Sequence, residues 1–210
     1  MPYKQPMVKC EMKGLLIVIE GMDQSGKKTQ TNLLASRLRK ADCPVEMISF
    51  PDYTTPIGRE IRKYLDGKRD FGPEIRQFLY VANRWERKKT LENWLGKGRV
   101  VIADRYTQSN LAYGLANGLD LQWMINLEQG LPKADVTIVL DIPVDTAFRR
   151  RKTMRDMYER DKAFLKRIRS SYHTLAKKFG WFLVNGEAPP ETVAENIWKI
   201  ISRFKRTKAF

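Results

Sequence analysis

Five short, mostly apolar runs constrain the fold of this 210-residue chain more than any other feature. They occupy residues 15–20, 45–50, 100–104, 136–141 and 181–185. Such continuous runs are typical of strands that are buried on both faces of a parallel sheet. Stretches with helical spacing separate them, so the sequence predicts one α/β domain over residues 1–210, with helices covering both faces of a five-stranded parallel sheet.

The stretches between the runs repeat apolar residues at helical spacing. One expected helix runs from Pro73 to Gly96, with proline at its start and glycine at its end. Its predicted core face consists of Ile75, Phe78, Leu79, Ala82 and Trp85. Three further helices are expected to have an apolar face. These faces contain Leu33, Leu34 and Leu38, residues between Phe164 and Phe179, and residues between Val193 and Phe204 in a basic C-terminal helix at 190–208.

The charge of the chain points to an anionic partner. Lysine and arginine exceed aspartate and glutamate enough to give +15, and residues 149–169 alone carry ten basic and three acidic side chains. A nucleotide and a nucleic acid are both candidates, but aromatic residues interleaved with basic ones on exposed strands are missing, which argues against nucleic acid. The two cysteines do not form a spaced disulfide framework, and the sequence shows no apolar leader or membrane-length run. We therefore expect a cytoplasmic protein.

The run GMDQSGK follows the first expected strand and precedes an amphipathic stretch. It matches the G-x4-G-K half of a phosphate-binding loop, in which backbone N–H groups and a helix N-terminus face the phosphates. We therefore expect ATP to be bound here, with Lys27 bridging its outer phosphates. The residues expected to bind ATP are Gly21, Met22, Asp23, Gln24, Ser25, Gly26, Lys27, Lys28 and Thr29.

Lys28 departs from this pattern, because the motif places there a hydroxyl that ligates Mg²⁺. An ammonium group cannot ligate a cation, and Thr29 lies about 100° further around the helix. Two alternatives remain open: water and a carboxylate hold the metal, or nucleotide binding is impaired. Asp104 is the candidate carboxylate, since it ends a predicted strand, and it would hold Mg²⁺ through water. Arg105 beside it could bind a phosphate bidentately.

Several ordered motifs resemble the thymidylate kinase family between Leu15 and about Asn185. They are IEGMDQSGKKTQ, FPDYTTPIG, ANRWE, DRYTQSNLAYG, GLPKADVTIVLD and DMYE. The resemblance implies a P-loop kinase that uses ATP and Mg²⁺ to convert dTMP to dTDP, and that pairs as a homodimer. The alternatives are a kinase for another deoxynucleoside monophosphate, and a nucleic-acid-binding P-loop protein without turnover.

The resemblance also implies an acceptor-binding region at about 51–90. Asp23 would lie beside the sugar 3′-hydroxyl, Tyr80 would stack on thymine, and Arg84 would bind the edge of the base. A tyrosine and an arginine one helical turn apart share a face, which agrees with this role. The remaining acceptor residues by resemblance are Pro51, Arg105, Gln108, Ser109 and Tyr113.

Catalytic arginines in this family lie either in the P-loop or in a lid. The loop here has none, so the resemblance implies a lid at about 146–160 that supplies Arg150 and Arg155, while Tyr158 approaches the acceptor. Many relatives have an arginine at the position of Tyr53, where it contacts the acceptor phosphate. Which residue takes over that contact here remains open. The candidates are Arg59, Arg62 and Arg76. Phe78 and Trp85 are expected in the core, and His173 is expected to be structural.

Overall fold

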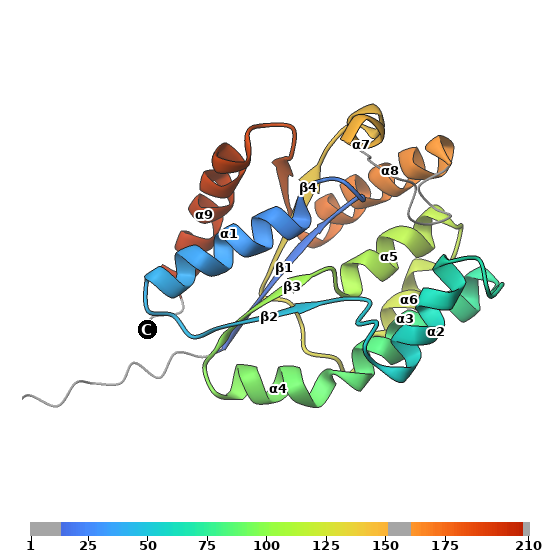
Figure 1. Cartoon of the computed structure of the whole chain (residues 1–210), viewed down its shortest axis with the longest axis horizontal. Coiled ribbons are helices and arrows are strands. Elements are labelled where there is room, and N and C mark those ends of the chain that lie inside the picture. Colours follow the sequence, from blue (N-terminus) through green and yellow to red (C-terminus); the bar gives the residue numbers. More distant parts are fainter. Residues whose placement is uncertain (1–13, 151–160, 208–210) are drawn as a thin grey trace, which may run out of the picture.

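The strands form a parallel sheet in the order β2-β3-β1-β4-β5 in this computed structural model, which describes residues 14–150 and 161–207, with side chains to 204 (Figure 1). The strands are β1 (Leu15–Gly21), β2 (Val45–Ser49), β3 (Val100–Asp104), β4 (Val136–Asp141) and β5 (Phe182–Asn185). The prediction of five parallel strands is confirmed, with boundaries within one residue at each end. Arg155 and Tyr158 lie outside the described residues.

The helices of the described segments cover both faces of the sheet. They are α1 (Lys27–Lys40), α2 (Pro56–Leu65), α3 (Pro73–Glu86), α4 (Lys88–Gly96), α5 (Thr107–Ala116), α6 (Leu121–Leu127), α7 (Val144–Arg150), α8 (Lys162–Phe179) and α9 (Pro190–Thr207). Helices α1 and α9 cover one face, and α4, α5 and α8 cover the other, while α2, α3 and α6 lie beside α5 (Figure 1). None of the helices so described is long and apolar enough to cross a membrane.

The core explains why β1 is apolar along its whole length. Successive strand residues point to opposite faces, so Leu15 and Ile17 pack with α1 and α9. Leu16 and Val18 pack on the other side with Leu91 of α4. Both sets are almost completely buried, as expected for a central strand of a covered sheet.

The single helix expected from Pro73 to Gly96 is wrong, because the chain forms two helices that meet at Arg87. Arg87 is the residue between the two helices, with φ −104° and ψ 0°. Its side chain donates to Asp52 Oδ2 at 2.6 Å and to Thr54 Oγ1 at 3.0 Å. These contacts tie the break to the segment that follows β2.

The predicted core face of α3 is wrong for three of its five residues, whereas Leu79 and Ala82 are half-buried and Leu79 packs against a small apolar cluster on α2. Ile75, Phe78 and Trp85 are 49%, 48% and 44% exposed, respectively. The buried side of α3 instead carries polar groups, Asn83 and Arg84, because this helix borders a cavity rather than the main core. Two other expected core residues, Leu33 and Phe179, are exposed as well.

Candidate active site

The loop between β1 and α1 has the backbone shape of a phosphate-binding loop. Gly21 and Gly26 have φ values of 136° and 95°, in the region that favours glycine. A Cβ atom at Gly21 would lie 2.5 Å from the carbonyl oxygen of Leu140, so the loop also needs glycine there for space. The loop therefore passes close to the sheet and delivers the N-terminus of α1 to the strand ends.

Lys27 points back into this loop. Its Nζ donates to the carbonyl oxygens of Gly21 at 3.1 Å and Met22 at 2.9 Å, and lies 3.8 Å from Asp23 Oδ1. Burial and the Arg105 charge lower the pKa of Lys27. Neutral carbonyl groups of the loop thus hold the buried ammonium group of Lys27 in place. The ammonium group is therefore positioned before an anion binds.

Lys28 and Thr29 are exposed in the first turn of α1 and line a large cavity of about 710 Å³ beside Lys27. Gln24, Ser25 and Gly26 line the same cavity. Met22 does not, because its side chain is buried in the core between α5 and α8.

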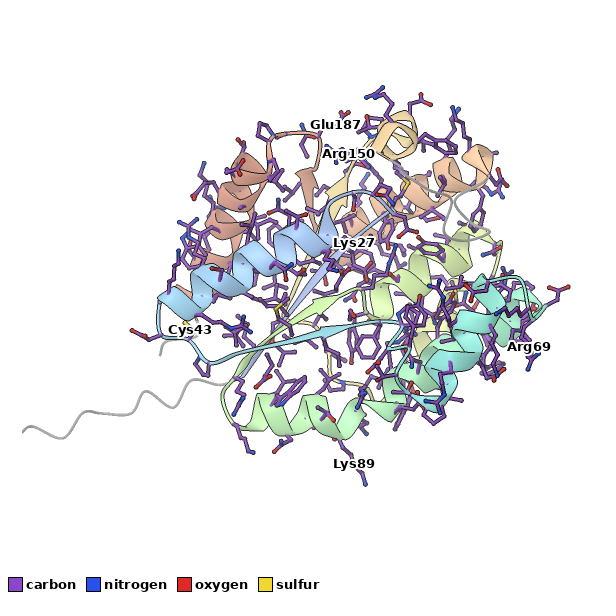
Figure 2. The ribbon with its side chains drawn as sticks, viewed as in Figure 1. Lys27, Cys43, Arg69, Lys89, Arg150 and Glu187 are labelled. Atoms are coloured by element: carbon purple, nitrogen blue, oxygen red, sulfur yellow. The ribbon has the colours of Figure 1, made fainter. Side chains whose placement is uncertain are left out.

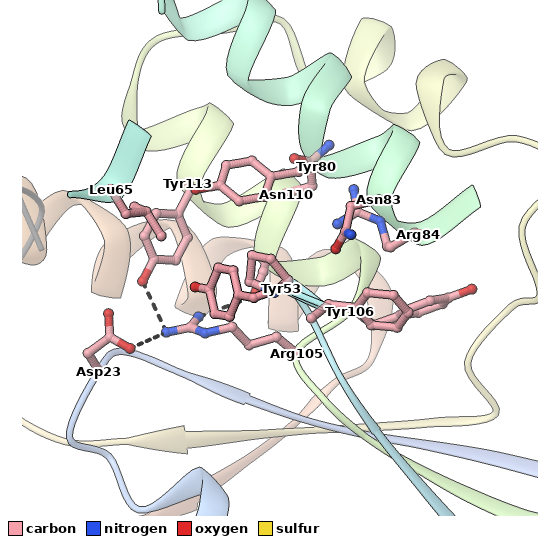
Figure 3. A pocket seen from close by; sticks show the side chains of 13 residues that line it. Asp23, Tyr53, Leu65, Tyr80, Asn83, Arg84, Arg105, Tyr106, Asn110 and Tyr113 are labelled. Carbon is pink, nitrogen blue, oxygen red and sulfur yellow. Dashed lines mark hydrogen bonds and ion pairs between the residues drawn. The ribbon is translucent and has the colours of Figure 1, made fainter. Parts of the chain in front are cut away.

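Arg105 occupies a strained position directly after β3. Its φ is 66°, which is uncommon for a residue with a side chain, and its N–H donates to Ile19 O at 3.0 Å. The guanidinium donates to Asp23 Oδ1 at 2.6 Å, Tyr113 Oη at 3.3 Å and Ser109 Oγ at 3.2 Å (Figure 3). The strained backbone therefore aims the guanidinium at the phosphate loop, and four expected site residues meet there.

The Asp23–Arg105 pair is electrostatically well matched. Burial alone would raise the pKa of Asp23, but the charges of Arg105 and Lys27 lower it to about 2. Burial would lower the pKa of Arg105, but Tyr113 and Asp23 raise it well above its usual range. Both groups are therefore ionised throughout the physiological range.

Glu20 supports this arrangement, and sequence reasoning missed it. Its side chain is 0% exposed and accepts hydrogen bonds from Tyr106 N (2.8 Å), Ser109 N (3.0 Å), Ser109 Oγ (2.7 Å) and Tyr172 Oη (2.8 Å). A carboxylate thus fixes the start of α5 beneath Arg105. The signal in the sequence was a glutamate at the end of an otherwise apolar strand.

A smaller cavity of about 110 Å³ lies between α3 and α5 (Figure 3). It is lined by Asp23, Phe50, Pro51, Tyr53, Leu65, Tyr80, Asn83, Arg84, Arg105, Tyr106, Ser109, Asn110 and Tyr113. Pro51, Tyr80, Arg84, Ser109 and Tyr113 are thus brought together, as the resemblance implied. Gln108 is not, since its Nε2 donates to Thr137 Oγ1 at 2.9 Å away from the cavity.

Arg84 ends in a buried polar cluster at the edge of this small cavity. Its Nε donates to Glu128 Oε2 at 3.1 Å, and its Nη2 donates to Glu128 Oε1. Asn110 Nδ2 donates to the same Oε1 at 2.8 Å. Neither Glu128 nor Asn110 was singled out from the sequence, because a partner 44 residues away in the chain leaves no local pattern.

The two cavities adjoin. Their shared lining consists of Asp23, Phe50, Pro51, Tyr53, Leu65 and Arg105. The large cavity continues past the P-loop to residues that sequence reasoning missed. They are Gly186 and Ala188 in the connection after β5, and Pro190 and Val193 at the start of α9. The Asp23–Arg105 pair therefore stands where a molecule in one cavity would meet a molecule in the other.

Asp104 and Arg150 line the large cavity from different sides. Asp104 ends β3, in register with Ser49 of β2, which also lines the cavity. Arg150 ends α7 and donates to Gln24 O at 3.4 Å, on the same side of the molecule as Lys27 (Figure 2). Arg150 and Asp104 thus add a cation and a carboxylate to the charged groups that line the space in front of the loop.

The three candidates for the arginine missing at Tyr53 differ in position. Only Arg62 among them lines the large cavity, with its guanidinium 5.6 Å from the Tyr53 ring centroid. Arg59 donates to Thr54 O at 2.8 Å, and Arg76 donates to Tyr64 Oη at 2.8 Å. The geometry therefore favours Arg62.

His173 pairs with the end of β4. Its Nε2 lies 3.1 Å from Asp141 Oδ2, and Arg169 donates to both oxygens of the same carboxylate, at 2.7 and 2.8 Å. The described residues contain no cluster of three or more potential metal ligands. The structural role expected for His173 stays a prediction.

The glycine loop with its lysine, set between two adjoining cavities at the carboxyl ends of a parallel sheet, defines a P-loop phosphotransferase. The family model described as "Thymidylate kinase" matches residues 19–197. The chain is 36% identical over 189 residues to the thymidylate kinase of Arabidopsis thaliana, covering 90% of this chain and 71% of the relative. It is 34% identical over 200 residues to that of Plasmodium falciparum, with 95% of each chain covered.

A solved thymidylate kinase from Candida albicans has the same fold, with a TM-score of 0.83 and 29% sequence identity. The similarity covers 92% of this chain and 93% of the Candida chain. The chain belongs to the thymidylate kinase family.

Proposed function

We propose that the chain transfers the terminal phosphate of ATP to dTMP, giving dTDP and ADP. The observation that carries this proposal is the junction of the two cavities at Asp23 and Arg105, directly in front of Lys27. ATP in the large cavity and a monophosphate in the small one would bring their phosphates together there. Family membership supports the identity of both substrates.

Positioning and positive charge account for the chemistry. Phosphoryl transfer needs little covalent help, because the acceptor phosphate is already ionised near neutral pH. Lys27 and the loop N–H groups would hold the outer phosphates of ATP, and Arg105 would orient the acceptor phosphate. Arg150 supplies a further cation at the donor cavity. Arg155 remains a prediction, since it lies outside the described residues.

The described residues fit a magnesium ion that takes most of its ligands from ATP and water. Mg²⁺ usually binds to one or two carboxylates and to substrate phosphates rather than to a full protein cage. Asp104 is the carboxylate at the donor cavity, and Ser49 lies beside it in the sheet. When bound, the ion would neutralise charge on the β- and γ-phosphates. Of the two alternatives raised by Lys28, this arrangement favours water and a carboxylate.

The small cavity would take the thymidine part of the acceptor. Tyr80 would lie against the base, and Tyr113 would lie beside the sugar, where its ring excludes a 2′-hydroxyl. Asp23 would orient the sugar, and Arg105, which is hydrogen-bonded to Asp23, would orient the phosphate. Many relatives have an arginine at the position of Tyr53, and Arg62 would serve in its place here.

A coupled ADP-release assay tests the proposal with dTMP, dUMP, dCMP, dGMP and AMP as acceptors. The Candida enzyme is described as having broad substrate specificity, so the panel must include other nucleotides. We expect dTMP to give the highest kcat/KM. Another deoxynucleotide with a higher value would instead support the second candidate, a different monophosphate kinase on this fold. Equal turnover of all five would contradict base recognition by Tyr80 and Arg84.

We also propose that two copies pair through the exposed apolar face of α3. Phe78 contacts Trp123 of α6, with ring centroids 5.6 Å apart, and Ile75 and Trp85 lie exposed on the same helix. Several exposed apolar side chains on one helix are typical of a protein interface, and identical helices can pair symmetrically.

The dimer is tested by light scattering after size-exclusion chromatography at micromolar concentration. Phe78→Glu is expected to give monomers, since it would place a charge in the interface. Phe179→Glu, at an exposed position on α8, is the control and should leave the dimer intact. A monomeric wild-type protein would contradict the proposal. The cytoplasmic location also stays a prediction, which cell fractionation would test.

A further inference from the structure

Glu128 is a buried carboxylate that no step described so far uses. It caps α6, and its side chain is 8% exposed, against 3% for Arg84. Oε2 accepts from Arg84 Nε at 3.1 Å, and Oε1 accepts from both Arg84 Nη2 and Asn110 Nδ2. Both donor side chains line the small cavity, whereas Glu128 itself does not. Glu128 therefore reaches the cavity only through two other residues.

The carboxylate fixes the orientation of the Asn110 amide. An ionised carboxylate can only accept hydrogen bonds, so Asn110 must turn Nδ2 toward Glu128 and Oδ1 away from it. Asn110 Oδ1 is buried, and no donor among the described residues reaches it. A buried carbonyl oxygen without a partner is costly, which is why such atoms usually meet a ligand or water. Asn110 thus offers an acceptor at the cavity.

Arg84 offers the complementary donor. Glu128 takes Nε and one N–H of Nη2, so among the described residues Nη1 and the second N–H of Nη2 remain to donate to a ligand. Together the two side chains present one donor and one acceptor. Thymine carries the matching pair on adjacent positions, with O4 as acceptor and N3–H as donor. Cytosine carries the reverse, with a 4-amino donor and an unprotonated N3 acceptor.

We propose that Glu128 is the positioning residue that makes the base site selective for a keto pyrimidine over an amino pyrimidine. This inference rests on the proposed function, because it concerns how the acceptor base is read. Glu128 holds Arg84 in place and locks the Asn110 amide with its oxygen toward the base. The 4-amino donor of cytosine would then face the Arg84 donor, and its N3 acceptor would face the Asn110 oxygen.

Glu128→Gln tests the proposal with almost no change in shape. The glutamine NH2 group replaces one of the two acceptor oxygens. At the Oε1 place it would donate to Asn110 Oδ1, so the Asn110 amide would turn over and present Nδ2 to the base. At the Oε2 place it would oppose Arg84 Nε and release Arg84 from its fixed position, so either placement disturbs the base site. We expect the KM for dTMP to rise about 10- to 100-fold, the effect of one mismatched buried hydrogen bond. The ratio of kcat/KM for dTMP over dCMP should fall by a similar factor. The kcat for dTMP and the KM for ATP should change little, because the base lies away from the transferred phosphate.

Glu92→Gln is the matched control, since Glu92 is half exposed on α4 and pairs only with Lys88 among the described residues. It should leave the dTMP to dCMP ratio unchanged. Combining Asn110→Asp with Glu128→Gln exchanges the two groups and provides the rescue. The new carboxylate at position 110 would again present a fixed acceptor, the new amide at position 128 would donate to its other oxygen, and the net charge would be restored. Most of the dTMP preference should return.

The outcomes separate the inference from the function on which it rests. A wild-type ratio in Glu128→Gln would overturn the role of Glu128, even if the enzyme phosphorylates dTMP normally. If Glu128→Gln does not fold, the exchange variant decides, and loss of its dTMP preference overturns the role. A wild-type protein that phosphorylates no monophosphate would overturn the proposed function. Calorimetric binding of dTMP against dCMP to wild type and variants would then still test the base site.

Discussion

At the scale of single residues, the Asp23–Arg105 ion pair joins the two halves of the site. Arg105 pairs with Asp23 of the P-loop at 2.6 Å while its backbone is held in a left-handed conformation. Strain of this kind costs about 1–3 kcal/mol and persists only where the surroundings fix it. Here Ser109, Tyr113 and the network around Glu20 do so.

The pH dependence of stability tests this pair. Asp23 has its pKa lowered from 3.8 to about 2, so the pair stabilises the folded state above pH 4 and loses that contribution as the pH falls toward 2. Asp23→Asn should therefore be less stable than wild type by about 1 kcal/mol at pH 6, after allowing for solvent screening, and the two should converge near pH 2. Urea unfolding across this pH range measures the difference.

A constant difference between the two stability curves down to pH 2 would show that the pair contributes nothing that depends on ionisation. Asp145→Asn is the control, because the Asp145 side chain is 74% exposed. It should change the free energy of unfolding by less than about 0.5 kcal/mol at any pH.

Glu20→Gln tests the network beneath Arg105. An amide has a single acceptor oxygen, so its NH₂ group would face donors from Tyr106, Ser109 or Tyr172. We expect a loss of about 2–3 kcal/mol in the free energy of unfolding, measured with urea. Glu46→Gln, which only breaks a partly exposed pair with Arg99, should cost less than about 1 kcal/mol. Equal losses in the two variants would contradict the role assigned to Glu20.

Sequence reasoning found the residues that a local pattern marks. Lys27 follows a glycine loop, and Asp104 and Arg105 end an apolar run, so chain position alone places them at the strand ends. Glu20 and Glu128 carry no such mark. Their roles come from contacts with residues 86 and 44 positions away, which only the folded chain brings together.

At the scale of helices and strands, continuous apolar runs predicted the strands well because both faces of this sheet are covered. The same logic failed for α3. Its apolar residues keep helical spacing, but Phe78 and Trp85 face outward while Asn83 and Arg84 face the cavity. Periodicity identifies an apolar face without saying whether the core or a second molecule covers it.

Gly114 on α5 lies so close to α6 and α3 that an added Cβ would press on the side chains of Met124 and Gln77. A Cβ there would lie 1.9 Å from Met124 Sδ and 3.0 Å from Gln77 Nε2. Gly114→Ala should therefore destabilise the protein by about 1–3 kcal/mol through overpacking. Gly96→Ala, at the end of α4 with nothing within 4 Å, should be neutral or slightly stabilising. Thermal unfolding of both variants checks this, and a neutral Gly114→Ala would contradict the packing described.

At the scale of the whole molecule, the order β2-β3-β1-β4-β5 places β1 at the centre. The P-loop that follows β1 lines the large cavity and reaches the small one through Asp23. The chain order of the strands was predictable from the sequence, but their spatial order was not, because crossover helices allow several arrangements. The sheet is shared by early and late segments, since β1 pairs with both β3 and β4.

This shared sheet supports the prediction of one domain. Differential scanning calorimetry should show one cooperative transition, with the calorimetric enthalpy equal to the van't Hoff enthalpy. If the proposed dimer forms, the midpoint should also rise with protein concentration. Two resolved transitions at all concentrations would contradict a single domain.

The central claim is that this site joins the outer phosphate of ATP to dTMP. Phosphorus NMR of the intact protein with ATP, Mg²⁺ and dTMP tests it most directly, because all reactants and products are resolved in one spectrum. We expect dTDP and ADP to appear in equal amounts, and Lys27→Met to slow the formation of both by about a thousandfold through loss of charge at the transferred phosphate. ADP without dTDP, or no change in the spectrum of the wild-type mixture, would contradict it.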